Sequence, residues 1–379
     1  MVPPASAMGR GLRSVAERSP VSWLIRRSGP PSGSAVKFAM RMLALVAVLA
    51  AGSCRIGLGV RSQRAIEKID IHTHFFASRG YLVPLLERWH TRAVLVNFSD
   101  GQPDSIVRRR WGTLVAMRDS EPTRFLLCTT FGLEGIEQPD FGDRVVAQLR
   151  RDLDDGAVMV KVWKDLGMQI RDAHGAYVQV DDPRLPPIWD FLAKRAVPVL
   201  IHSADPRDGW RPLDPRSSHY QYFSTHPDYY PYLHPGIPSW GSIIASRDRW
   251  LSRNPQLLVI GAHLASMADD LEGLSKTLDA HPNLYVDVAA RFGDMSRGPA
   301  DRVRRFFLTY QDRILFGSDR STNEGAQASS EASTDMKKTE MEYTAWWNYL
   351  TVTLRLPPAV LNKFYHGNAE RLLGAAKAR

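Results

Sequence analysis

The stretch Ile69–Phe75, IDIHTHF, places two histidines one residue apart in an apolar, β-branched run. Runs of this composition are typical of β-strands, in which successive side chains point to opposite faces. We therefore expect His72 and His74 to project to one face, and Ile69 and Ile71 to project to the other. Two imidazoles on one face can bind one metal ion. The pair is weak evidence for a metal site by itself, so further ligands must be sought in the rest of the chain.

Seven more short apolar runs follow this one, and segments with helical patterns separate most of them. Near-continuous apolar strands are typical of a parallel sheet that is covered on both faces. Eight strands with intervening helices predict an α/β fold, a (β/α)8 TIM barrel. Helices are expected at 141–156 and 186–197, a long insert after strand five, and further helices at the C-terminus. The expected strands are 65–72, 93–99, 125–131, 157–163, 197–202, 257–263, 283–289 and 313–319.

Polar side chains stand at the ends of several expected strands. The first strand supplies the two histidines, the fourth holds Lys161, the fifth ends in His202, the sixth in His263 and the eighth in Asp319. The carboxyl ends of the strands form the active-site face of such barrels. Four strands that each bring a histidine or a carboxylate to one mouth predict a metal centre.

The charge of the chain is concentrated at its start. The formal net charge is +9, and residues 1–64 carry ten basic residues against one acidic residue, Glu17. The remainder is therefore formally neutral, which argues against a nucleic-acid partner. We divide the chain into a basic segment, 1–64, and a barrel domain, 65–379. The only cysteines are Cys54 and Cys128, so no disulfide framework is expected.

A signal-like segment lies within the basic region. Lys37 and Arg41 precede an apolar run, and small residues lead to Cys54, so that 42–54 has the order of a bacterial secretory signal. The end of this segment, AAGSC, is similar to a lipobox, in which the cysteine carries lipid. We therefore expect an exported protein, either periplasmic or anchored to the membrane as a lipoprotein. The translation start could also lie further along, at Met40 or Met42.

Five motifs together resemble the amidohydrolase superfamily, and within it the amidohydrolase-related branch, which includes metal-dependent decarboxylases. They are DIHTHF, VLIHSAD, LLVIGAHLAS, RILFGSD and FYHGNAERLLG, which occur in this order between about Ile66 and Gly374. The resemblance implies one divalent metal ion, with Zn²⁺ as the default, held by His72, His74, His202 and Asp319. Asp319 would also move protons in the reaction.

The resemblance leaves two residues with alternative roles. His263 would be a ligand in two-metal members, and would orient the water or polarise the substrate in one-metal members. Lys161 would be carbamylated and bridge two ions in two-metal members. We favour one metal, with Lys161 as a cation that faces an anionic group of the substrate, and we count Asp319, His263 and Lys161 as the catalytic residues.

Substrate selection is expected from the insert after strand five. Residues 203–250 are dense in aromatic side chains, which predicts an ordered lid over the metal. Arg207 and Trp210 in this insert, and Arg291 after strand seven, are candidate substrate-binding residues. The polar stretch 320–340 predicts a mobile loop beside strand eight.

These features favour an exported metal-dependent hydrolase that acts on an amide, ester or lactone bond of a small molecule. A decarboxylase of an aromatic or unsaturated carboxylic acid, on the same scaffold, is the alternative. A lipid-anchored binding protein without turnover is the third reading. The sequence is compatible with a homo-oligomer and does not name the substrate.

Overall fold

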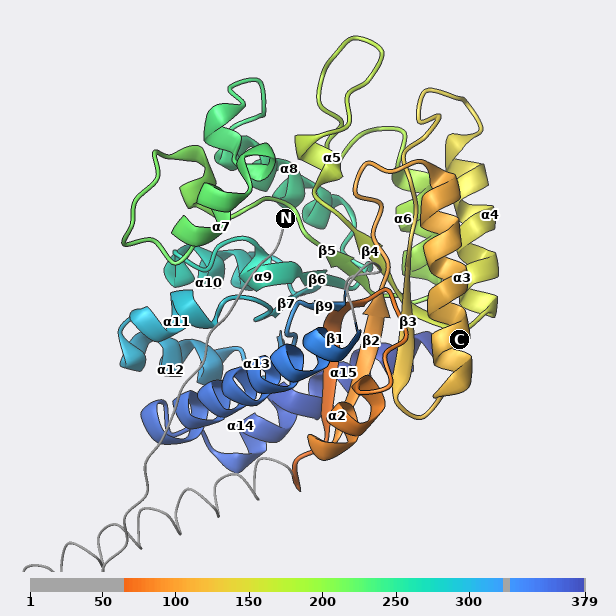
Figure 1. The fold of residues 1–379 in the computed structure, drawn as a ribbon. Coiled ribbons are helices and arrows are strands. Elements are labelled where there is room, and N and C mark those ends of the chain that lie inside the picture. The colour runs from red at the N-terminus through yellow and green to blue at the C-terminus, as the bar shows by residue number, and fades with distance from the viewer. Residues whose placement is uncertain (1–64, 323–327, 378–379) are drawn as a thin grey trace, which may run out of the picture. The chain divides into compact units, whose positions relative to one another are not determined.

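The computed structural model describes residues 65–322 and 328–377, which lie in one compact unit, Gly59–Arg379. The predicted signal-like segment and Cys54 are outside the described residues. Nine parallel strands form a single sheet in the order β8-β7-β6-β5-β4-β3-β2-β1-β9 (Figure 1). The strands are β1 Lys68–Phe75, β2 Thr91–Val96, β3 Phe125–Thr130, β4 Ala157–Val162, β5 Val199–Ile201, β6 Val259–Gly261, β7 Leu284–Asp287, β8 Ile314–Leu315 and β9 Arg320–Thr322.

The sheet closes through the segment that joins its two outermost strands. β8 pairs with β7, and β9 pairs with β1. Between them, the backbone N–H of Ile71 donates to Phe316 O at 3.1 Å and that of Asp319 donates to His72 O at 2.8 Å. β8 and β9 therefore form one broken eighth strand, and the predicted (β/α)8 barrel is confirmed. The break replaces the single strand expected at 313–319.

The helices cover the outside of the barrel. In α4, Phe141, Val145 and Leu149 recur every four residues and are buried against the sheet. The helices are α2 Leu82–Arg88, α3 Asp104–Ser120, α4 Phe141–Asp154, α5 Asp165–Met168, α6 Pro186–Lys194, α7 Tyr220–Thr225, α8 Trp240–Arg253, α9 Ala262–Ala265, α10 Leu271–Ala280, α11 Phe292–Arg297, α12 Ala300–Thr309, α13 Ala328–Asn348, α14 Pro358–Asn362 and α15 Asn368–Lys377. None of the described helices is both long and apolar enough to cross a membrane.

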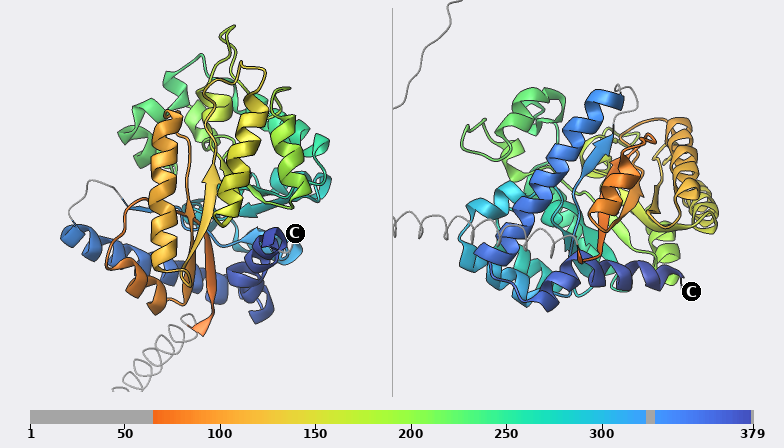
Figure 2. Two further views of the ribbon diagram at one scale, coloured as in Figure 1. Left: turned by 90° about the vertical axis from the view of Figure 1, so that its right-hand side faces the viewer. Right: turned by 60° about the horizontal axis from the view of Figure 1, so that its bottom comes forward.

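The barrel interior is a separate apolar cluster. It gathers one or two side chains from seven strands, among them Val94, Leu200 and Leu315, with Leu372 and Leu373 of α15. α15 lies at the end of the barrel away from the insert, and Figure 2 (right) brings this end forward. The opposite end of the interior is left for polar side chains.

A bulge in β1 changes the predicted alternation. Between Asp70 and Thr73 this strand advances three residues while β2 advances two. Ile69 and Ile71 lie in the interior cluster, and His72, one residue later, also points inward. The prediction that the isoleucines and the histidines occupy opposite faces is therefore wrong. The extra residue lets the isoleucines and the two histidines share the inward face of the strand.

Two other regions refine the predictions. The insert after β5 comprises residues 203–239, with three 3₁₀ turns and α7, because α8 belongs to the regular barrel. Figure 1 shows it above the strand ends. The loop expected at 320–340 is wrong at Arg320–Thr322, which form β9, and from residue 328 onward, where α13 begins. The later part of α13 is fixed by Tyr343 and Trp346, which pack into the core.

Candidate metal centre

Two histidines of β1 and the aspartate between β8 and β9 converge at the barrel mouth. Oδ1 of Asp319 lies 3.4 Å from Nε2 of His74 and 3.6 Å from Nε2 of His72. The ligand atoms of these three residues lie within 4.8 Å of one another. An N,N,O set of this kind suits a divalent transition metal such as zinc.

The second nitrogen of each imidazole is already engaged. Nδ1 of His74 lies 3.0 Å from the carbonyl oxygen of Val96, and Nδ1 of His72 lies 2.8 Å from Oδ2 of Asp287. Carbonyl and carboxylate oxygens can only accept, so each Nδ1 carries the proton and each Nε2 offers a lone pair. This is the arrangement of metal-binding histidines, in which an outer partner fixes the ring.

Asp319 owes its position to its backbone. Its φ of 60° is left-handed, a conformation that aspartate adopts more readily than most residues, and it occurs where β8 breaks off. Burial acts to raise the pKa of this carboxyl. Electrostatic interactions with His74, His263 and His72 outweigh burial and hold the pKa well below its usual range. Asp319 is therefore a carboxylate at neutral pH.

His202, the predicted ligand from strand five, lies beside the trio but not within it. Its ring centroid is 4.5 Å from that of His263, and its Nε2 is buried without a hydrogen-bond partner. Burial lowers its pKa well below the usual value, and the nearby His263 and Lys164 lower it further. The imidazole is therefore neutral. An unpaired buried nitrogen costs about 1–3 kcal/mol. A metal ion at the trio would give this lone pair a partner, so the residues present fit the implied group.

His263 occupies a strained turn rather than a strand end. Residues His263–Ser266 all have positive φ, between 52° and 62°, a conformation that costs about 1–2 kcal/mol for each such residue. The turn is tied down by Arg247, whose Nη1 donates to Ala265 O at 2.6 Å, and by Ser266, whose Oγ donates to Ala204 O at 2.6 Å. Backbone strain that is held this firmly is a feature of functional sites.

The tautomer of His263 revises its predicted role. Nδ1 lies 2.8 Å from Ala289 O and so carries the proton, while burial lowers the pKa of the ring to about 3. Nε2 of this neutral ring is an acceptor. His263 is therefore suited to orient a water or to bind an ion, and it is not suited to polarise a carbonyl group by donating a proton to it.

Lys161 lies inside the cluster. Its Nζ is 3.1 Å from Nε2 of His72 and the side chain is buried. Burial lowers the pKa of this amine, and the carboxylates of Asp287 and Asp319 oppose that shift. The position agrees with either predicted role, a cation near the substrate or a carbamate ligand.

Two of the three predicted substrate-binding residues, Arg207 and Arg291, line one small pocket together with Ser266. Arg291 is buried close enough to His202 and His263 to lower their pKa values, and its nearest described acceptors are its neighbour Ala290 O at 2.9 Å and Asp294 Oδ2 at 3.9 Å. Arg207 instead stacks on Trp240, with 4.1 Å from guanidinium to ring centroid, and pairs with Asp269 and Asp270.

Trp210 belongs to the packing of the insert. Its Nε1 donates to Pro238 O at 3.0 Å, and its ring lies against the small core of Met168, Ala204 and Ile243. The charge of Arg291 reaches His202 and His263, Arg207 shares a pocket with Arg291, and Trp210 packs within the insert. Substrate binding by these residues stays a prediction.

The structure adds three features to the predicted site. Asp287 in β7 is fully buried and holds His72. Lys164 and Asp205 form a buried ion pair beside His202. Tyr222 of the insert feels the charges of Asp205, Asp319 and Arg291, although burial is the main cause of its raised pKa. The carboxylate in the otherwise apolar run NLYVDVA was the one available signal for Asp287.

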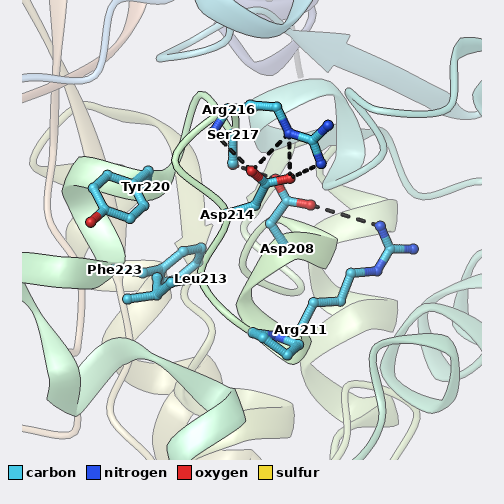
Figure 3. A pocket seen from close by; sticks show the side chains of 9 residues that line it. Asp208, Arg211, Leu213, Asp214, Arg216, Ser217, Tyr220 and Phe223 are labelled. Atoms are coloured by element: carbon cyan, nitrogen blue, oxygen red, sulfur yellow. Dashed lines mark hydrogen bonds and ion pairs between the residues drawn. The ribbon is translucent and has the colours of Figure 1, made fainter.

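A pocket in the insert lies apart from the candidate metal ligands. It has a volume of about 420 Å³, and its nine lining residues all come from 208–223 of the insert. Figure 3 shows the Asp214–Arg216 ion pair on one side of it and the rings of Tyr220 and Phe223 on the other. None of the candidate metal ligands lines it, so we do not assign the reaction there.

Comparisons with known proteins agree with this geometry. A family model described as amidohydrolase matches residues 69–375. No curated protein sequence matches the chain significantly. Similar solved structures include 2,6-dihydroxybenzoate decarboxylase from Rhizobium, at 17% identity and a TM-score of 0.51. The match covers 82% of this chain and 99% of the decarboxylase chain. Another is 4-oxalomesaconate hydratase from Rhodopseudomonas palustris, at 13% identity and a TM-score of 0.50. The match covers 82% of this chain and 97% of the hydratase chain. At these identities the two structures support the fold alone.

Proposed function

The chain belongs to the amidohydrolase family, and we propose that it is an exported metal-dependent hydrolase that acts on an amide, ester or lactone bond of a small molecule. One observation carries the proposal. The Nε2 lone pairs of His72 and His74 face the carboxylate of Asp319, and each Nδ1 is fixed by another acceptor. This donor set, with His202 beside it, suits one divalent ion, and Zn²⁺ is our first choice.

When bound, such an ion lowers the pKa of water and polarises a substrate carbonyl. Asp319, a carboxylate at neutral pH, accepts the proton of the attacking water and passes it to the leaving group. His263 accepts a hydrogen bond from that water through Nε2 and so orients it. Lys161 provides positive charge at the same face.

Arg291 supports an anionic group in the substrate. Its side chain is buried, its charge lowers the pKa values of His202 and His263, and its ion-pair partner among the described residues, Asp294, is 3.9 Å away. Arginine binds carboxylates through two parallel hydrogen bonds, which fixes orientation as well as position. We therefore propose a small carboxylate-bearing substrate, enclosed by Tyr222 of the insert.

One observation favours decarboxylation of an aromatic acid as the second candidate. Aromatic rings continue from the metal centre along one wall of the mouth. The ring of His74 lies 4.9 Å from Phe98, Phe98 lies 5.5 Å from Trp163, and Trp163 lies 6.3 Å from Tyr229. A flat ring could stack on this wall with its carboxylate near the metal and Arg291.

Metal analysis with a substrate panel tests the proposal. The purified protein is loaded in turn with Zn²⁺, Mn²⁺ and Fe²⁺, bound metal is counted, and amides, esters, lactones and aromatic acids are assayed. We expect one ion per chain and metal-dependent hydrolysis. Release of carbon dioxide without hydrolysis would support the lyase, and metal binding without any turnover would support a binding protein. Two ions per chain, with a carbamate on Lys161, would contradict the one-metal site.

A further inference from the structure

Asp287 contacts two histidines of the metal centre at once. Oδ2 lies 2.8 Å from Nδ1 of His72, while Oδ1 accepts from the backbone N–H of His263 at 2.7 Å and of Ala289 at 3.1 Å. The carboxylate is fully buried. Gly317 packs against both residues of the pair, since a Cβ there would lie 3.0 Å from Cβ of His72 and 3.5 Å from Cβ of Asp287.

The three imidazoles whose Nδ1 has a described hydrogen-bond acceptor, those of His72, His74 and His263, differ in what that acceptor is. His74 and His263 are held by backbone carbonyl oxygens, which no substitution can remove. His72 alone among these three is held by a side chain. Its Nε2 faces Nζ of Lys161 at 3.1 Å, a contact in which an N–H of Lys161 can donate to a lone pair on Nε2.

We propose that Asp287 is a positioning residue that places the proton of His72 on Nδ1 and so prepares Nε2 to bind the metal. This inference rests on the proposed metal centre and adds a residue to it. Asp287 is not one of the three residues of the trio, and both of its carboxylate oxygens are engaged by His72 and by backbone N–H groups. It acts through His72, and through the backbone amide that begins the strained turn of His263.

The geometry predicts that the Asp287→Asn variant switches the tautomer of His72. The two backbone N–H groups need an acceptor, so the amide oxygen of asparagine takes the place of Oδ1. The amide NH₂ then faces Nδ1 of His72 and can only donate to it. His72 must carry its proton on Nε2, where it blocks the lone pair that the metal needs. Loss of such an outer partner typically weakens metal binding about 10- to 100-fold.

The experiment uses the full chain with selective ¹⁵N-histidine labelling, in which only the eleven histidines give signals. Spectra of the metal-free protein report the tautomer, and the His72→Gln variant identifies the His72 signals. Zn²⁺ affinity is measured by competition with a chromogenic chelator. We expect the Nδ1–H tautomer in the wild type, the Nε2–H tautomer in Asp287→Asn, and an affinity that is 10- to 100-fold weaker in the variant.

Asp152→Asn is the matched control. Asp152 is also fully buried and hydrogen-bonded, to Arg108 and Thr129, but it contacts none of the histidines. We expect it to leave the tautomer unchanged and Zn²⁺ affinity within about twofold of the wild type. Equal losses of affinity in both variants would show a merely structural role and overturn the proposal.

The wild-type spectrum keeps the proposal testable if Asp287→Asn does not fold. A proton on Nε2 of His72 in the wild type would overturn it without any variant. Failure of the proposed function has a different signature. If the wild type binds no Zn²⁺ but His72 has the Nδ1–H tautomer, the metal centre is refuted while the positioning by Asp287 stands.

Discussion

Lys164 and Asp205 form an enclosed ion pair at the barrel mouth. Nζ of Lys164 lies 2.7 Å from both carboxylate oxygens of Asp205, and the two side chains are 3% and 4% exposed. Lys164 follows β4 and Asp205 follows β5, and the ring centroid of Tyr229 in the insert lies 4.7 Å from the same Nζ. The pair therefore joins two strand ends to the insert.

Removing one partner of this pair should destabilise the fold strongly. Asp205→Asn leaves a buried ammonium without its counter-charge, and we expect a loss of about 3–5 kcal/mol in the free energy of unfolding, measured by urea titration. The double variant Lys164→Met, Asp205→Leu should recover part of that loss. Asp214→Asn, which breaks an exposed ion pair in the same insert, should leave the midpoint unchanged. If Asp205→Asn behaves like Asp214→Asn, the pair is not a structural element.

The proton shuttle should depend on Asp319. Asp319→Asn replaces a carboxylate with an amide that cannot accept the proton of water, so turnover should vanish even when the metal is supplied in excess. Bound metal is counted alongside the rate, so that loss of metal and loss of chemistry are separated. Near-normal turnover in this variant would place the shuttle on another residue.

His263 should affect the rate more than the metal. His263→Asn removes the Nε2 acceptor that orients the water, and a positioned acid or base of this kind typically contributes about a hundredfold or more. We expect metal content close to that of the wild type and a loss of that size in kcat. A variant that emptied the site would show that His263 is a ligand, as in a two-metal centre.

Asp165 should make stability depend on pH. Burial raises its pKa to about 6, against 3.8 as the ordinary value, although Ser99 and backbone amides donate to it. The folded state thus holds a proton that the unfolded state has lost between these two values. Stability from this group is present below about pH 3.8 and is lost as the pH rises through about 6. Asp165→Asn should remove this slope and raise the unfolding midpoint at pH 7, and identical slopes in both proteins would contradict the assignment.

Export should depend on the segment before the barrel. We expect the chain to cross the inner membrane and to carry lipid on Cys54 if AAGSC is processed as a lipobox. Fractionation and mass spectrometry of the mature N-terminus measure this. Cys54→Ser should release a soluble periplasmic form. Uncleaved wild-type protein in the cytosol would refute both steps.

Apolar patterning was enough to predict the barrel and its metal-binding mouth. Strands such as AVMVKVW and VPVLIH are apolar because both faces of a parallel sheet are covered, so their number and spacing are visible in the chain. His72, His74 and Asp319 could be proposed in the same way, since polar groups at the carboxyl ends of such strands must meet.

The geometry of these residues depends on long-range contacts. The bulge in β1, the break between β8 and β9 and the left-handed turn at His263 each depend on hydrogen bonds between residues far apart in the sequence, such as Asp319 N–H to His72 O. The protonated nitrogen of each imidazole is likewise set by a distant acceptor, Val96 for His74 and Asp287 for His72. The fold and the types of candidate ligand could be predicted, because these follow from local composition. The tautomers, the buried ion pair and the role of Asp287 required the packed structure, because they arise from contacts that no local pattern encodes.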